Sequence, residues 1–355
     1  MSTAAAEDDL SPTGDAARRR RLVFVVLALA LPAALALGVS LGSVSLPPLG
    51  VAGSLLAAAG VPLEQAGLDA TGETILWSVR LPRVLLAALV GGGLAVVGAA
   101  LQSLFRNPMA DAGLLGVGPG AALGAVVAVS LGWAHEVFLA LPLSAFAGAM
   151  TAVVTVYLLA HAGGRPSLHG LLLTGLAVSS LAAAGTSMLL VATEEFRVRT
   201  VLFWLAGGLE GRGWEHLRLG AAFILTGSAL LTALARPLDV LSLGEEEAAA
   251  LSLPVHATRM GIFTLASLVA GPATALAGSV PFVGLVAPHA LRPLVGGLAR
   301  RLLPASFLAG AVLVVVADLA ARTVSERMDL PLGSVTAFVG APYFLLALRA
   351  HEGRR

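Results

Sequence analysis

The sequence predicts an all-α protein that crosses a membrane about ten times. Of its 355 residues, 57% are hydrophobic and 12% are charged, whereas an ordinary soluble domain has roughly 25% charged residues. The apolar residues fall in blocks of about twenty, the length of helix that crosses the hydrocarbon core of a bilayer. The formal net charge is +1, and the basic residues stand mostly between or beside these blocks. This composition excludes a soluble globular protein and offers no basic surface for nucleic acid.

The N-terminus predicts a cytoplasmic tail followed by a first span. Residues 1–21 are polar and end in four arginines, Arg18 to Arg21, before an apolar run over residues 22–41. A signal peptide is the alternative, but the run is long for a signal core and no small-x-small cleavage site follows it. We therefore interpret it as an uncleaved span with a cytoplasmic N-terminus, following the positive-inside rule.

Residues 22–350 predict one transmembrane domain of ten spans. Residues 42–83 are rich in Pro, Gly and acidic residues and predict a loop with one short helix at the interface. The other spans are expected near residues 84–105, 112–132, 137–160, 168–192, 214–235, 257–277, 279–298, 302–321 and 332–349. Ten spans return the C-terminal tail, residues 351–355, to the cytoplasmic side. Fourteen of the 22 basic residues then lie inside and eight outside, which supports this orientation.

The chain lacks the residues that several catalytic and cofactor sites need. It contains no cysteine, which excludes disulfides, thiolate zinc sites and a cysteine nucleophile. All 22 basic residues are arginine, so a phosphate-binding loop with its lysine is excluded and any nucleotide must bind to another chain. No Ser/His/Asp set or H-E-x-x-H pattern occurs in a credible context. We expect no enzyme active site, no metal site and no cofactor in this chain.

A faint internal repeat links the two halves. The pattern Leu-Pro-x-Ser-x-x-Ala-Gly-Ala occurs over residues 141–149 and again over residues 303–311. The two copies lie in spans that run in opposite directions, so they predict an inverted repeat, a device common in transporters. Such matches also arise by chance in helices rich in Ala and Gly. Both interpretations stay open at this point.

Two motifs near the second span have structural and functional readings. Arg80-Leu81-Pro82-Arg83 precedes the span on the outer side, where the arginines either snorkel at a helix start or dock an acidic partner. Asn107-Pro108, on the inner side, predicts a turn, and Asp111 is expected to cap the helix that follows.

The segment Leu241 to Leu253 is expected on the inner side. It is too short and too acidic to span, but it has the composition of a helix, with Gly244 and three glutamates at its start. It is either a solvated surface helix or a short helix that inserts into the groove of a partner.

Polar groups in the last spans suggest either structure or proton transfer. His289 follows Pro288 in span eight, where a relay and a structural hydrogen bond are both reasonable. Asp318 and Arg322 are four residues apart at the outer end of span nine and can pair on one helix face. A proton-coupled secondary transporter would use Asp318 and His289.

Several segments together, and in order, resemble the FecCD-type permeases of ABC importers for iron-siderophore, cobalamin and haem. The matching segments are Arg80-Leu81-Pro82-Arg83, Gly98-Ala99-Ala100-Leu101-Gln102, Arg106-Asn107-Pro108-Met109-Ala110-Asp111, Leu243-Gly244-Glu245, Phe282-Val283-Gly284-Leu285-Val286-Ala287-Pro288-His289, Ala317-Asp318 with Arg322, and Leu330-Pro331-Leu332-Gly333 with Val335-Thr336. The resemblance covers nearly everything from about residue 22 to 350. Each motif alone is weak, but the seven in one order are specific.

The resemblance implies a type II ABC importer permease in the bacterial plasma membrane. Its partners would be a second permease subunit, identical or paralogous, two cytoplasmic subunits that bind ATP and Mg, and an extracytoplasmic substrate-binding protein. Arg80, Arg83 and Arg322 would dock the binding protein. Residues 240–254 would couple to the ATPase, through the residues Leu243, Gly244, Glu245, Ala248 and Leu251. The remaining matched residues would be structural: Gln102, Asn107, Pro108, Pro288, His289 and Asp318.

The expected function is import of a ferric siderophore complex or a related metal chelate, with cobalamin or haem as alternative cargo. The chain departs from the family pattern at Ala112, where the motif usually has Pro, and at Ser252, where it usually has Gly. Ser252 leaves the end of the coupling helix open.

Overall fold

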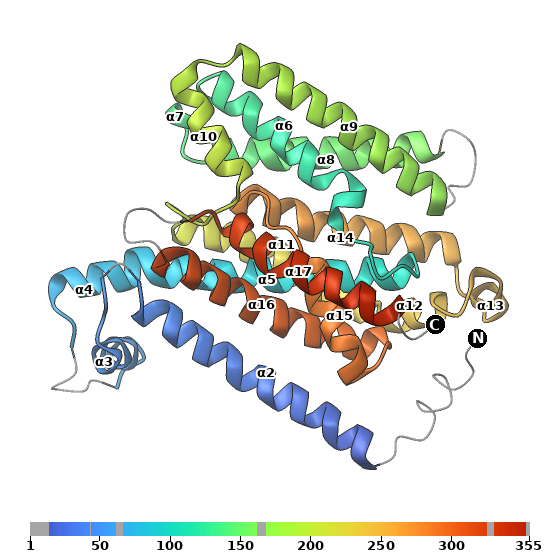
Figure 1. Ribbon diagram of the computed structural model, residues 1–355, viewed down its shortest axis with the longest axis horizontal. Coiled ribbons are helices and arrows are strands. Elements are labelled where there is room, and N and C mark those ends of the chain that lie inside the picture. The colour runs from blue at the N-terminus through green and yellow to red at the C-terminus, as the bar shows by residue number, and fades with distance from the viewer. Residues whose placement is uncertain (1–13, 43, 62–66, 162–167, 325–329, 353–355) are drawn as a thin grey trace.

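The computed structural model describes residues 14–42, 44–61, 67–161, 168–324 and 330–352, and every regular element in these ranges is helical. Figure 1 shows long helices lying side by side, with short helices at the two ends of the bundle. The elements are α2 (Gly14–Ser40), α3 (Pro48–Ala58), α4 (Ala70–Thr74), η1 (Ile75–Arg80), α5 (Leu81–Leu104), η2 (Ala112–Leu115), α6 (Val117–Ser130), α7 (Trp133–Glu136), α8 (Ala140–His161), α9 (Leu168–Ala192), α10 (Glu195–Leu205), α11 (Trp214–Ala233), α12 (Ala235–Leu241), α13 (Glu245–Ala250), α14 (Val255–Ala277), α15 (Val283–Val295), α16 (Ala299–Thr323) and α17 (Leu332–Glu352).

All ten predicted spans are helices, and seven of them are long and apolar enough to cross a membrane. The predicted short helix in the loop after the first span is α3. The first helix in the described part of the chain, α2, begins at Gly14, so the end of the predicted polar tail is helical as well. We name the two ends of the bundle the α4 end and the α13 end, after the short helices that lie there (Figure 1).

Two predicted spans are only about two thirds as long as expected. α6 has 14 residues and α15 has 13, so each is about 20 Å long and too short to cross a bilayer alone. Each follows a residue with a positive φ, Gly116 at 75° and Phe282 at 67°. Short helices preceded by irregular backbone are typical of transporters. Non-helical backbone within the membrane must be buried in protein or line a cavity, because lipid cannot satisfy its hydrogen bonds.

The second span begins earlier than predicted. Residues Ala70–Leu104 form one continuous apolar helical stretch, so the Arg80 motif lies inside it and not at its start. The turn just before Pro82 is a π-helix, in which the N–H of Leu81 donates to the carbonyl of Leu76. Proline cannot donate within a helix and its ring crowds the preceding turn, and the wider turn lets the helix continue.

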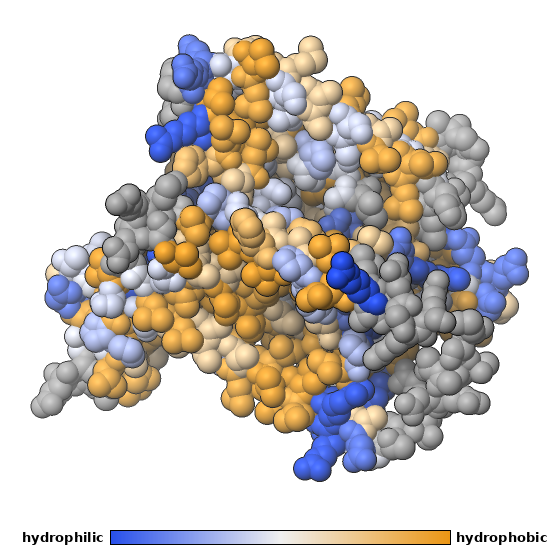
Figure 2. Space-filling model, in the orientation of Figure 1, coloured by the Kyte–Doolittle hydropathy of each residue, from blue (hydrophilic) through white to orange (hydrophobic). Residues whose placement is uncertain are grey.

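Burial divides the helices into a core and a periphery. α5 and α14 are mostly buried inside the molecule, whereas α2 and α9 bury only a minority of their residues. Figure 2 shows hydrophobic side chains along α2 and α17 and hydrophilic ones towards the margins. An exposed apolar band between polar ends is the surface that a lipid bilayer covers.

Glycines set the distances between the core helices. A Cβ atom added to Gly98 would lie 1.9 Å from the carbonyl oxygen of Gly284, and one added to Gly310 would lie 2.3 Å from that of Gly91. These backbones therefore touch directly, as small residues allow in membrane bundles. In the predicted repeat, Gly148 is the counterpart of Gly310 and also makes a close contact, but with α6. The repeat therefore keeps the order of short and long helices but not the contact of this glycine.

Candidate functional site: the two ends of the bundle and the cavity between them

At the α4 end, Arg80 is buried and bound to backbone. Its guanidinium donates to the carbonyl oxygens of Val39 at 2.9 Å and Ser40 at 2.8 Å, and also to that of Val44. These carbonyls belong to the end of α2 and the chain just after it, where the last carbonyl groups of a helix lack partners within the helix. Arg80 therefore holds the end of α2 against α5.

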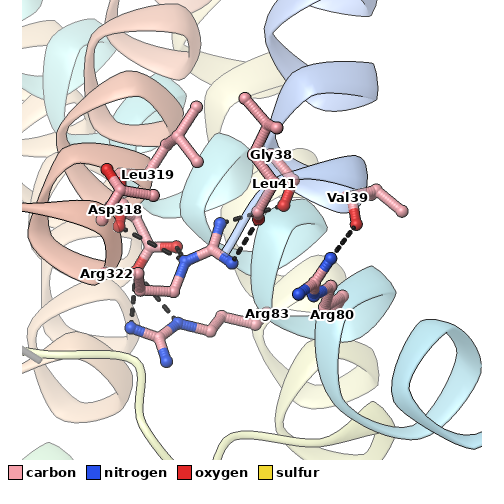
Figure 3. A network of polar contacts seen from close by, with 9 residues as sticks. Gly38, Val39, Leu41, Arg80, Arg83, Asp318, Leu319 and Arg322 are labelled. Carbon is pink, nitrogen blue, oxygen red and sulfur yellow. Dashed lines mark hydrogen bonds and ion pairs between the residues drawn. The ribbon is translucent and has the colours of Figure 1, made fainter. Parts of the chain in front are cut away.

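Asp318 joins three helices at the same end (Figure 3). The carboxylate is 1% exposed, and its Oδ1 accepts from Arg83 of α5 while its Oδ2 accepts from Arg322 of α16, each at 3.0 Å. Arg322 also donates to the carbonyl oxygens of Gly38 at 3.0 Å and Leu41 at 3.3 Å. The predicted pair between Asp318 and Arg322 is confirmed, and Arg83 adds a partner far away in sequence.

The three arginines expected to dock a partner differ in their surroundings. Arg80 and Arg322 are buried, at 5% and 6% exposed. The side chain of Arg83 is 12% exposed. It lines a cavity of about 630 Å³ together with Arg199 of α10 and Arg212. Glu210 contributes the carboxylate of this cavity. Burial lowers the pKa of Arg212 to about 10, which still leaves its guanidinium charged at neutral pH. The cavity therefore has a net positive lining.

Neither α10 nor its two arginines, of which Arg199 lines this cavity, was predicted as a site. Arg197 of α10 donates to the carbonyl of Ser130 at 3.0 Å and pairs with Glu194 at 3.0 Å. Arg199 lies over the ring of Phe203. The one available signal was the minority of eight arginines on the predicted outer side of the membrane, where the positive-inside rule disfavours them.

At the opposite end, α13 presents apolar side chains to the exterior. Leu243 and Leu251, on either side of the helix, are 63% and 64% exposed, whereas Ala248 is fully buried. The side chain of Glu245, at 59% exposed, forms an ion pair with the buried Arg259 of α14. The helix is therefore anchored through Ala248 and Glu245 and offers its leucines to a partner.

The backbone shows where α13, the helix expected to couple to the ATPase, ends. The N–H of Ser252 donates to the carbonyl of Ala249 at 2.9 Å, and the N–H of Leu253 donates to that of Ala248 at 3.0 Å. This is the Schellman arrangement, which places a left-handed residue just after the helix. Ser252 is that residue, with φ at 61°, so a serine occupies a conformation that glycine adopts with less strain.

The predicted structural residues connect α5, its following turn and α15. Gln102 is 1% exposed. Its amide donates to the carbonyl of Gly284 at 3.0 Å and accepts from Arg292 at 3.2 Å. Asn107, before Pro108, accepts from the backbone N–H of Met109 at 2.9 Å, an Asx-turn. The predicted cap is confirmed, because Asp111 accepts from Gly113 N–H at 2.8 Å.

His289 lies in α15 after Pro288 and packs against α17. Its ring meets the rings of Tyr343 and Phe344 edge-on, with centroids 6.2 Å and 6.5 Å apart. Asp318, in contrast, lies at the other end of the next helix and is bound by two arginines. The two residues that a proton relay would use are thus not brought together.

A second cavity, of about 380 Å³, lies where α6 and α15 begin. The sequence did not predict it. Its lining includes Asp111, Ser279, Phe282 and Thr274, together with Trp204 at the end of α10. Most of the remaining lining is Gly, Ala, Pro, Leu and Val. Within the described residues no group of three or more His, Asp or Glu could hold a metal ion.

Comparisons with known proteins match nearly the whole chain. The model of the FecCD transport family matches residues 28–350. The cobalamin import system permease BtuC of Halobacterium salinarum is 42% identical over 290 residues, which is 82% of this chain and 77% of that protein. The Fe(3+)-citrate import system permease YfmE of Bacillus subtilis is 36% identical over 333 residues, covering 94% and 96% of the two chains.

A solved structure supports the same relationship. A metal-chelate type ABC transporter in an inward-facing conformation matches with a TM-score of 0.81 and 30% identity, over 93% of this chain and 99% of that one. Fold, sequence and motif order therefore agree. The chain belongs to the FecCD transport family and is a multi-pass membrane permease subunit of an ABC importer, whose ATPase activity resides in partner subunits.

Proposed function

We propose that this permease carries a ferric siderophore complex or a related metal chelate into the cytoplasm. ATP hydrolysis in two partner subunits would drive the import, and a binding protein on the outer side would deliver the cargo. Relatives named as Fe(3+)-citrate permeases in Bacillus subtilis and Escherichia coli support a metal-chelate cargo. The arginine-lined cavity at the α4 end supports an anionic cargo. Cobalamin is the second candidate, because the Halobacterium salinarum relative carries that name.

The observation that carries the coupling part of this proposal is the exposure of two leucines on α13. A short acidic helix outside the bilayer has no lipid to cover Leu243 and Leu251, and exposed apolar side chains of this kind favour a protein partner. We assign this partner as the ATPase, which places the α13 end and both termini in the cytoplasm. The excess of arginines on that side supports the orientation.

The α4 end would then face the binding protein. Arg83 lines the cavity there, so we assign it the direct contact with acidic residues of the binding protein. Arg80 and Arg322 donate to backbone carbonyls and to Asp318. Their part in docking would be to hold the ends of α2 and α16 in place around Arg83.

The path for the cargo would run through the cavity between α6 and α15. Its lining of small and apolar residues supports this role, because a wall that bound a chelate tightly would not release it. A second permease subunit would supply the opposite wall. Alternating access would open this path to one side at a time as ATP binds and is hydrolysed.

The test is uptake of a labelled ferric siderophore into proteoliposomes that hold this chain with its ATPase and binding protein. We expect uptake to need ATP and all three components and to collapse in Glu245→Arg, because the reversed charge faces the buried Arg259. Glu136→Arg reverses the charge of an exposed residue on α7, near the other end, and should leave uptake intact. Unlabelled ferric citrate and cobalamin, added as competitors, distinguish the candidate cargoes.

Two outcomes would contradict the proposal. Uptake that a proton gradient drives without ATPase would exclude ATP-driven import. Uptake of cobalamin with no uptake of any ferric chelate would leave the transport mechanism standing and change the cargo.

A further inference from the structure

The carboxylate of Asp239, just before α13, caps the start of a different helix, α16. Asp239 lies in α12, six residues before Glu245, and its Oδ1 accepts from the backbone N–H of Ala299, the first residue of α16. The residue at the N-cap position of α16 is Leu298, whose side chain cannot accept a hydrogen bond. The start of α16 is therefore capped by the segment that carries α13.

Asp239 is a half-buried carboxylate beside the start of α16. Burial raises the pKa of Asp239, while the backbone N–H groups of Ala299 and Arg300 and the charges of Arg300 and Arg301 act in the opposite direction. A carboxylate at a helix N-terminus also interacts favourably with the helix dipole. These contacts join α12 to α16 through charge as well as through a hydrogen bond.

α16 reaches from this contact to the opposite end of the bundle. It has 25 residues, which corresponds to about 37 Å. Near its far end Asp318 binds Arg83, which lines the arginine-lined cavity at the α4 end. Between the two ends, the backbone contact of Gly310 with Gly91 holds α16 against α5. A movement of α12 therefore has a rigid element through which it can reach the cavity.

We propose that Asp239 is a positioning residue that transmits the movement of α13 to α16, and through α16 to the arginine-lined cavity at the α4 end. This proposal rests on the proposed contact between α13 and the ATPase. The second tie of the coupling segment, between Glu245 and Arg259, leads to α14 and has a well-exposed carboxylate. The contact of Asp239 leads instead to α16, which carries Asp318 near its far end.

The experiment follows the far end of α16 in the assembled transporter in nanodiscs. The chain contains no cysteine, so spin labels can be placed on Val324→Cys, after α16, and on Leu219→Cys, in α11. Both side chains are exposed, at 72% and 42%. The distance between the labels is measured before and after trapping with Mg-ATP and vanadate, which needs no cargo.

We expect ATP to shift the distance in the wild-type background. Asp239→Ala should reduce the shifted population about fivefold, the factor that corresponds to about 1 kcal/mol of capping energy. Asp239→Asn keeps an oxygen that can accept from Ala299 and should keep the shift. Asp69→Ala removes the cap of α4, where Asp69 accepts from Gly72 N–H at 2.8 Å, and should also keep it.

A further variant separates transmission from simple stability. Leu298→Asp, added to Asp239→Ala, caps α16 from its own N-cap position, whose backbone is already extended, but does not restore the link to α12. We expect this double variant to recover the thermal stability and not the ATP-induced shift. Recovery of the shift together with stability would overturn the proposal, as would a full shift in Asp239→Ala.

Failure of the proposed function would look different. A wild-type chain that neither copurifies with the ATPase nor shows any shift with ATP would refute the contact between α13 and the ATPase, whatever the variants of Asp239 do.

Discussion

The two ends of the bundle both contain arginine–carboxylate pairs, and they differ in how deeply these pairs are buried. At the α4 end, Asp318 is 1% exposed and is shared by Arg83 and Arg322. At the α13 end, Glu245 is 59% exposed and binds Arg259. A buried pair is costly to break because each charge left alone is desolvated, whereas an exposed pair contributes little and is screened by salt.

The difference in burial separates ion pairs that hold helices together from an ion pair whose carboxylate another protein can reach. The Asp318 cluster ties α2, α5 and α16 and should stay closed during transport. The carboxylate of Glu245 is exposed and accessible to another protein, although its partner Arg259 is buried. Under the proposed function, the same chemical pair supports stability at one end and contact with the ATPase at the other.

The largest expected effect comes from removing the shared carboxylate. Asp318→Ala leaves Arg83 and Arg322 facing each other and should cost about 3–5 kcal/mol of unfolding free energy. Glu245→Ala, at the exposed end, should cost no more than about 1 kcal/mol. Thermal unfolding in detergent measures both. Equal losses would show that burial does not separate the two ends.

The next effect tests the backbone contact between α5 and α15. Gly98→Ala places a methyl group against the carbonyl oxygen of Gly284 and should cost about 1–3 kcal/mol, because both atoms belong to packed helices. Gly261→Ala, in α14, meets no atom within 4 Å and should gain up to about 1 kcal/mol from helix propensity. If Gly98→Ala leaves the free energy of unfolding unchanged, α5 and α15 can move apart at little cost.

A gain in stability is expected from a substitution at Ser252, just after α13. Ser252→Gly relieves the positive φ of this residue and should stabilise the protein by about 1 kcal/mol. Ala250→Gly, two residues earlier and inside the helix, should destabilise it by a similar amount. The midpoints of thermal unfolding of the two variants should therefore move in opposite directions. Movement in the same direction would argue against the Schellman arrangement.

The smallest effect is a pH dependence from Asp239. Its folded pKa is raised by burial, so the folded protein binds this proton more tightly than the unfolded chain. Stability from this group should fall as pH rises from the ordinary aspartate pKa of about 4 through the raised value, and then level off. Asp239→Asn should remove this slope from a plot of unfolding temperature against pH. A slope that is unchanged in the variant would assign it to other carboxylates.

Much of the fold followed from patterns that are local in sequence. Apolar blocks predicted the helices, and the order of seven short motifs predicted the family, because both signals need only neighbouring residues. The pair between Asp318 and Arg322 was predictable for the same reason, since residues four apart share a helix face. The lengths of α6 and α15 were not predictable, because an apolar run does not show which of its residues are helical.

The sequence by itself determined that this is a polytopic α-helical permease with a short acidic helix outside the membrane. Only the tertiary structure decided which arginines line a cavity and which are buried, and it alone joined Arg83 to Asp318 and Asp239 to the start of α16. These contacts link residues 235 and 60 positions apart. Burial and long-range pairing depend on how helices pack, and a single sequence does not record the distance between two helices.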